Sequence, residues 1–183
     1  ATYTAPEYAS ETRLLETTTE APLWPFEVTL EASYDPQHAL ESILEHLAGR
    51  IPCASAYLAI RSGEVLHVQA TWKCLPSFQG FEIALAEHPH LQKILATGQG
   101  LVLTELPEDS FLTNPMVMTA TAHSWLGVPV MIGRRTIGLI AFASIQPRAF
   151  TSKHLQPASM RAGQLSYNIE SAIIFSETTH YLQ

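Results

Sequence analysis

Residues 124–142 read SWLGVPVMIGRRTIGLIAF, and this stretch decides the fold. Two almost continuous apolar runs, over 125–132 and 136–145, flank the polar turn Gly133-Arg134-Arg135. Such a pair of runs predicts a β-hairpin. Strands that are apolar at nearly every position belong to sheets with both faces covered. We therefore expect a layer of structure on each side of this hairpin.

The segments around the hairpin predict an α+β fold. Asp35-Pro36 favours the start of an amphipathic helix over 36–48. The other expected elements are strands over 55–61, 65–73, 81–86 and 101–106, a short helix over 90–96, and a long helix from Thr151 to about Tyr181. The resulting prediction is a central six-stranded antiparallel sheet, with helices 36–48 and 151–178 on one face and the variable segment 107–123 on the other.

The first predicted hairpin, formed by 55–61 and 65–73, alternates apolar and polar residues. If the two apolar sets share a face, Ala56 pairs with Ala70 and Ile60 pairs with Leu66. This register places Cys53 and Cys74 on opposite faces of the sheet. We therefore expect no disulfide between them.

Composition indicates one globular domain and excludes several kinds of partner. The chain has 183 residues, of which 46% are hydrophobic and 15% are charged. Its 17 acidic and 10 basic residues give a net charge of -7, which disfavours binding to nucleic acid or to an anionic membrane surface. No stretch reaches the ~20 apolar residues needed to span a bilayer, so we expect no membrane insertion.

Residues 1–33 are predicted to be an N-terminal arm or linker, and residues 34–183 the domain itself. Pro22 and Pro25 interrupt any helix in the arm. Because the chain begins with Ala1 rather than Met, we expect it to be a piece of a longer protein.

The hairpin at 124–142 resembles the last hairpin of a GAF domain. It has a strand of small and apolar residues with Pro129, a polar turn, and a second strand beginning Ile137-Gly138. The following run 148–155, RAFTSKHL, is similar to the phenylalanine-threonine entry to that family's terminal helix. The order of elements fits from Asp35 onward. The resemblance implies a cytoplasmic sensor or regulatory module joined to an output domain of the same polypeptide.

The same resemblance helps to define the ligand. Bilin-binding members attach their chromophore through a cysteine before the last hairpin, and residues 107–123 contain none. We therefore expect no covalent bilin. The signature of cyclic-nucleotide-binding members is absent as well. An unknown small molecule remains the expected ligand.

Family members bind ligands between the sheet and the variable segment, which implies a candidate pocket here. Its residues are Trp72, Phe111, Met116, Met118, His123 and Trp125. Apolar, methionine-containing walls with few polar groups suit a small-molecule cavity. The alternative is that these side chains fill the core and that His123 is a histidine in water at a strand edge.

Catalytic and metal sites are not predicted. His88 and His90 lack a third ligand at a recognisable spacing, and we interpret them as solvated loop residues. One branch of the family reduces free methionine sulfoxide with clustered cysteines. A thiol-dependent reductase using Cys53 and Cys74 is therefore an alternative function, although the expected function is not enzymatic.

The terminal helix predicts a homodimer. Besides its denser apolar stripe it carries a second one, formed by Met160, Tyr167, Ile174 and Tyr181 at seven-residue spacing. That spacing is typical of a helix–helix seam. The expected function is therefore small-molecule sensing, dimerisation or both within a signal-transduction protein. A purely structural dimerisation module without a ligand is a further alternative.

Overall fold

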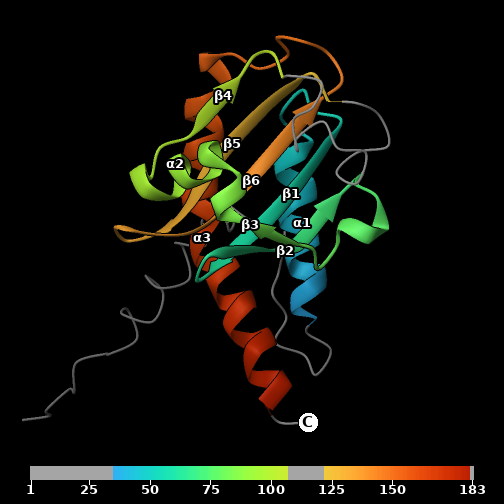
Figure 1. Cartoon of the computed structure of the whole chain (residues 1–183). Helices are drawn as coiled ribbons and strands as arrows, with labels where there is room; N and C mark the ends of the chain where they lie inside the picture. Colours follow the sequence, from blue (N-terminus) through green and yellow to red (C-terminus); the bar gives the residue numbers. More distant parts are fainter. Residues whose placement is uncertain (1–34, 107–121, 182–183) are drawn as a thin grey trace, which may run out of the picture. The chain divides into compact units, whose positions relative to one another are not determined.

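A computed structural model describes residues 35–106 and 122–181, and the side chains up to residue 178 (Figure 1). The elements in chain order are α1 (Pro36–Ala48), β1 (Ser55–Ser62), β2 (Val65–Trp72), β3 (Glu82–Ala84), α2 (Pro89–Thr97), β4 (Leu101–Leu103), β5 (Ser124–Ile132), β6 (Arg135–Ser144) and α3 (Ser152–Tyr181). Short 3-10 turns cover Pro76–Phe78 and Leu85–Glu87. The predicted arm over 1–33 lies outside the described residues.

The six strands form one antiparallel sheet in the order β3-β2-β1-β6-β5-β4 (Figure 1). This confirms the fold predicted from the sequence. The hairpin β5–β6 lies inside the sheet, since β6 also pairs with β1 and β5 also pairs with β4. Its residues 124–130 and 138–144 are buried.

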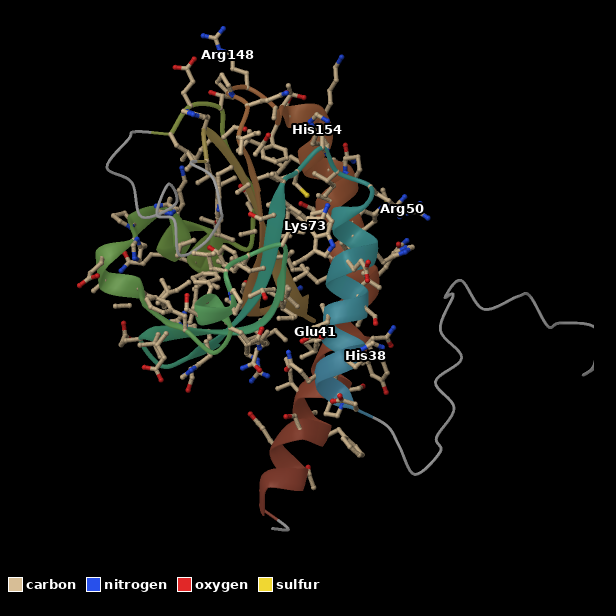
Figure 2. All side chains as sticks on the ribbon, turned by 90° about the vertical axis from the view of Figure 1, so that its right-hand side faces the viewer. His38, Glu41, Arg50, Lys73, Arg148 and His154 are labelled. Carbon is tan, nitrogen blue, oxygen red and sulfur yellow. The ribbon has the colours of Figure 1, made fainter. Side chains whose placement is uncertain are left out.

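The helices cover the two faces of the sheet as separate layers. Helices α1 and α3 pack against each other, α1 against β2 and α3 against β5. Figure 2 shows these two helices on one side of the sheet and α2 on the other. The predicted placement of α1 and α3 is therefore confirmed. Of the segment expected on the opposite face, residues 107–121 lie outside the described residues.

The register predicted for the first hairpin is wrong. Ala56 pairs with Trp72 and Leu58 with Ala70, whereas Ala59 pairs with Val68. The extra residue, Gln69, forms a β-bulge that reverses the alternation along β2.

The bulge is held from outside the hairpin. The carbonyl oxygen of Gln69 accepts hydrogen bonds from the side-chain amides of Gln37 (2.8 Å) and Gln79 (2.7 Å). Gln37 belongs to α1, and Gln79 follows the first 3-10 turn. Tertiary contacts, and not the local apolar pattern, therefore decide the alternation along β2.

Gly138 on β6 allows β1 to approach closely. A Cβ atom at this position would lie 2.2 Å from the carbonyl oxygen of Ala59. No side chain fits there without displacing backbone. A glycine inside a strand often marks such a close approach of a neighbouring backbone, here that of β1.

Helix α1 starts where the sequence predicted, after Asp35. At α1 the Asp35 carboxylate accepts a hydrogen bond from the backbone N–H of Gln37 at 3.0 Å. Helix α3 runs along the sheet and continues beyond its end (Figure 1). Among the helices described, none combines the length and apolar character required to cross a membrane.

Candidate ligand-binding site

The structure does not bring the predicted pocket residues together as one set. Phe111, Met116 and Met118 lie outside the described residues. Trp125 is fully buried on β5, on the face covered by α2. His123 is exposed, and Trp72 is half-buried.

His123 takes part in the sheet through hydrogen bonds of its backbone, while its ring is exposed. Its N–H donates to the carbonyl of Ser144 at 2.8 Å, and its carbonyl accepts from the N–H of Leu106 at 2.9 Å. These bonds extend the strand ladders at the start of β5. The exposed side chain agrees with the alternative reading of a histidine at a strand edge.

Trp72 and Trp125 lie on opposite faces of the sheet by register. Trp72 pairs with Ala56, which pairs with Phe142, whereas Trp125 pairs with Ala143. Neighbouring residues of a strand point to opposite faces. Trp72 therefore belongs to the face of α1 and α3, where Lys73 Nζ lies 4.5 Å from its ring centroid. The bulge at Gln69 is the reason, because it moves the end of β2 to the other alternation.

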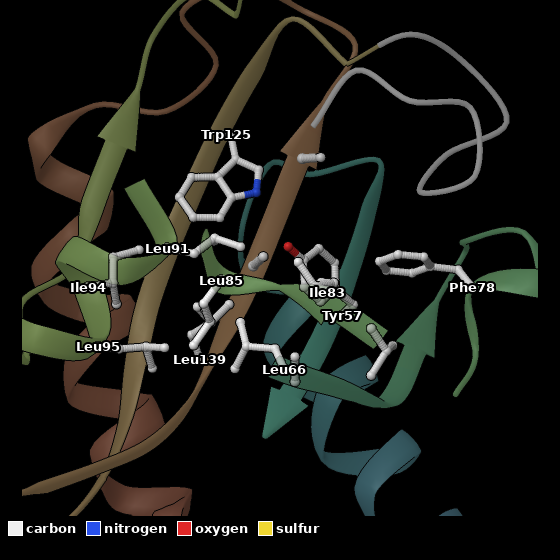
Figure 3. Packing of buried hydrophobic residues seen from close by; sticks show 14 of the residues in the cluster. Tyr57, Leu66, Phe78, Ile83, Leu85, Leu91, Ile94, Leu95, Trp125 and Leu139 are labelled. Carbon is white, nitrogen blue, oxygen red and sulfur yellow. The ribbon is translucent and has the colours of Figure 1, made fainter. Parts of the chain in front are cut away.

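Trp125 belongs to an apolar cluster between α2 and the sheet, called the cluster under α2 below. Its large buried members include Tyr57, Leu66, Phe78, Ile83, Leu91, Ile94, Trp125 and Leu139. Tyr57 meets Phe78 edge to face, with ring centroids 5.1 Å apart. Leu91 and Ile94 of α2 belong to the same cluster, and Figure 3 shows Leu91 next to Trp125. No Asp, Glu, Lys or Arg is buried anywhere in the part of the chain that the structure describes.

Four buried side-chain polar atoms have no hydrogen-bond partner among the described residues. They are Ser55 Oγ, Tyr57 Oη, His90 Nε2 and Trp125 Nε1. An unpaired buried donor or acceptor is costly, and most native proteins hold few of them. Four in one region therefore mark this region as a candidate site.

Strand register brings three of the four atoms to one face of the sheet, and α2 on that face carries the fourth. Ser55 and Trp125 both pair with Ala143, and Tyr57 pairs with Ala141. Both alanines belong to the cluster under α2. His90 lies on α2 itself, and its ring meets the indole of Trp125 edge to face at 5.5 Å.

The hydroxyl of Tyr57 and the indole nitrogen of Trp125 point toward one another in Figure 3. Burial raises the pKa of Tyr57 well above its usual value, the nearby Cys74 thiol adds to this, and the Trp125 N–H opposes it. The two groups are thus close, yet they form no hydrogen bond of acceptable geometry. At neutral pH the Tyr57 hydroxyl is protonated.

His88, which directly precedes α2, and His90, within α2, are not solvated loop residues, so that interpretation was wrong. His88 is only 8% exposed, and its ring centroid lies 5.9 Å from that of His90. Burial, together with the neighbouring His88, lowers the pKa of His90 to about 4. His90 is therefore neutral at pH 7. Within the described residues, no group of three potential ligands is placed to hold a metal ion.

The two cysteines are free thiols in different surroundings. Cys53 donates to the carbonyl of Ala48 at the end of α1 (3.5 Å), whereas Cys74 packs against the cluster under α2. Their separation was predicted from a register that proved wrong. Burial raises the pKa of each thiol to about 11. Neither is a ready thiolate at neutral pH.

Two open hollows lie beside α3, and neither is lined by Ser55, Tyr57, His90 or Trp125, the residues with unpaired buried atoms. One, of about 440 Å³, is lined by the ends of β1 and β6 and by α3, and includes Ile174. The other, of about 450 Å³, lies between α3 and the β4–β5 edge. Of the predicted pocket residues that the structure describes (Trp72, His123 and Trp125), none lines either hollow.

These features define an α+β domain with an antiparallel sheet and a group of unpaired buried polar atoms on one face of it. The GAF domain family model matches residues 33–170, and the chain belongs to the GAF domain family. The anaerobic nitric oxide reductase transcription regulator NorR of Aliivibrio fischeri is 23% identical over 143 residues. That match covers 73% of this chain and only 27% of that protein.

Solved structures share the fold at low identity. The GAF domain/HD domain protein from Geobacter sulfurreducens has a TM-score of 0.62 at 17% identity, covering 76% of this chain and 95% of that one. The type II free methionine-R-sulfoxide reductase from Thermoplasma acidophilum has a TM-score of 0.60 at 15% identity, covering 74% and 92%. At such identities the likeness extends to the fold alone.

Proposed function

We propose that this chain is a small-molecule-sensing regulatory domain of a larger, cytoplasmic signal-transduction protein. The observation that carries the proposal is the set of four buried, unpaired polar atoms in an otherwise apolar cluster under α2. Sites for small molecules combine apolar walls with a few well-placed polar groups. The similarity to a transcription regulator supports a regulatory setting.

The sheet offers a route from the ligand to the helices. Trp125 faces the cluster under α2, and the next residue, Leu126, is buried on the other face, toward the helices. Helix α3 packs on β5 there. A ligand that binds one arrangement of β5 better than another shifts the position of α3, provided that its affinities for the two differ.

Helix α3 is also proposed to form a homodimer seam. Of the four predicted positions, Met160 is 59%, Tyr167 73% and Ile174 55% exposed, and the side chain of Tyr181 lies outside the described residues. Phe175 beside them is 43% exposed. Large apolar side chains in such a row are covered in many proteins by a partner. A ligand-free dimerisation module is the second candidate, and it rests on this surface alone.

A thiol-dependent reductase is the third candidate. Cys74 lies beside the buried site, which favours it, and the fold is shared with a methionine sulfoxide reductase. Against it, burial raises the pKa of Cys74 to about 11, and Cys53 lies at the end of α1. Assaying free methionine sulfoxide reduction by the wild type and by Cys74→Ser decides this candidate.

The main proposal is tested by screening a metabolite library for thermal stabilisation. A ligand at 100 times its Kd raises the free energy of unfolding by about 2.7 kcal/mol. We expect at least one compound to raise the melting temperature of the wild type, and to do so less for Trp125→Phe. A library without any stabilising compound, at concentrations up to the millimolar range, would leave the dimerisation module as the better account.

A further inference from the structure

We infer that the site under α2 takes a small uncharged molecule that accepts hydrogen bonds, and that it discriminates against anions. This inference rests on the proposed function and specifies its ligand. It follows from three features of the buried polar atoms: what they can donate, what surrounds them, and what charge they carry.

The donors define the first requirement. An indole N–H donates and never accepts, so Trp125 Nε1 can be paired only by an acceptor atom. Tyr57 Oη lies close to it and is able to donate to the same acceptor. Both side chains are at most 1% exposed. A carbonyl, ether or ring nitrogen between them would pair two orphaned groups at once.

The surroundings define the second requirement. Among the described residues, no Asp, Glu, Lys or Arg side chain is buried, so no buried ionic partner is available there for a charged ligand. Placing an ion among such groups is costly unless it is paired. Trp125, Phe78 and Leu91 instead offer flat and branched apolar surfaces. A ligand with an aromatic or aliphatic body and a neutral polar end would match these side chains in polarity.

The protonation states of the polar groups are also consistent with an uncharged ligand. Burial keeps the pKa of Tyr57 high and lowers the pKa of His90 to about 4, so both are neutral at pH 7. His90 Nε2 then acts as donor or acceptor according to its tautomer. The four polar atoms thus provide hydrogen bonding without charge.

The test uses pairs of probes with one skeleton and different charge. Benzamide and benzoate, nicotinamide and nicotinate, and indole-3-acetamide and indole-3-acetate are titrated into the protein at pH 7 by calorimetry. At least one amide is expected to bind, at least tenfold more tightly than its carboxylate. Tyr57→Phe is expected to weaken that amide by about threefold to tenfold, which is the value of one hydrogen bond.

Tyr167→Phe is the matched control, because it removes the same hydroxyl from a side chain that is 73% exposed on α3. It is expected to leave the affinity unchanged. A carboxylate that binds as tightly as its amide and is weakened by Tyr57→Phe overturns the inference but keeps the proposed function. Amide binding that Tyr57→Phe leaves unchanged overturns the inference too. If neither the probes nor the metabolite library bind, both are wrong.

Discussion

Replacing Tyr57 with phenylalanine should make the unliganded protein more stable. The hydroxyl of Tyr57 is buried and unpaired among the described residues, while its ring packs edge to face on Phe78. Tyr57→Phe keeps the ring and removes only the hydroxyl. In an ordinary buried tyrosine, where the hydroxyl is hydrogen-bonded, the same change removes about 1 kcal/mol of stability.

The expected size follows from the cost of an unpaired group. Leaving a buried donor or acceptor unsatisfied costs about 1–3 kcal/mol. We therefore expect Tyr57→Phe to raise the free energy of unfolding by about 1 kcal/mol. For a domain of this size that corresponds to a rise of about 2–4 °C in melting temperature. The measurement is urea unfolding of wild type and variant, compared at equal m value.

Tyr167→Phe is the matched control, because it removes the same hydroxyl from an exposed side chain. Tyr167→Phe, on the exposed face of α3, should change the stability by less than about 0.5 kcal/mol. If Tyr57→Phe instead destabilises the protein by about 1 kcal/mol or more, the hydroxyl is paired in the folded protein. The site would then lack one of the two unpaired donors, Tyr57 Oη and Trp125 Nε1, that the inference assigns to a ligand. A substitution that raises stability but weakens ligand binding would be an example of the known trade-off between stability and function.

Four further outcomes are expected. Burial lowers the pKa of His90 to about 4 from 6.5, so the free energy of unfolding should be highest above pH 6.5 and fall as the pH drops toward 4. His90→Gln should make this fall shallower, whereas the same substitution at the exposed His38 should not. Gly138→Ala should destabilise by about 1–3 kcal/mol because its Cβ meets backbone, whereas Gly163→Ala, with open space around it, should stabilise by up to about 1 kcal/mol. Both thiols should react with a thiol reagent more than tenfold faster in the unfolded than in the native protein at pH 7, since burial raises each pKa to about 11, and zero free thiols in the denatured, unreduced monomer would contradict the free-thiol assignment. Tyr167→Glu with Ile174→Glu should shift sedimentation toward monomer, while Gln92→Glu with Ala96→Glu on α2 adds the same charge and should not; equal sedimentation of both pairs would exclude the α3 seam.

The fold could be predicted because its signals are local. The apolar runs of 125–132 and 136–145 and the cap at Asp35 each depend on neighbouring residues in the chain. The register of the first hairpin could not, because the bulge at Gln69 is held by amides of Gln37 and Gln79. Those contacts exist only after the elements have packed.

The site was only partly predictable for a related reason. Trp125 was identified through the family resemblance, and its hairpin is locally encoded. Tyr57 was missed because Ala56, Leu58 and Ile60 looked like the covered face of β1, whereas α2 also covers the other face. His90 follows Pro89, which reads as a loop signal, and yet Pro89 begins α2. Burial from the second layer is invisible to an alternation pattern.

The indole N–H resonance of Trp125 tests the central claim, a ligand bound under α2, most directly. In ¹⁵N-labelled protein this signal is assigned as the one missing from Trp125→Phe. Saturation with a stabilising compound from the screen should move the resonance downfield, because the N–H gains an acceptor. An unchanged Trp125 signal with a compound that clearly stabilises the protein would place the ligand elsewhere and contradict the account.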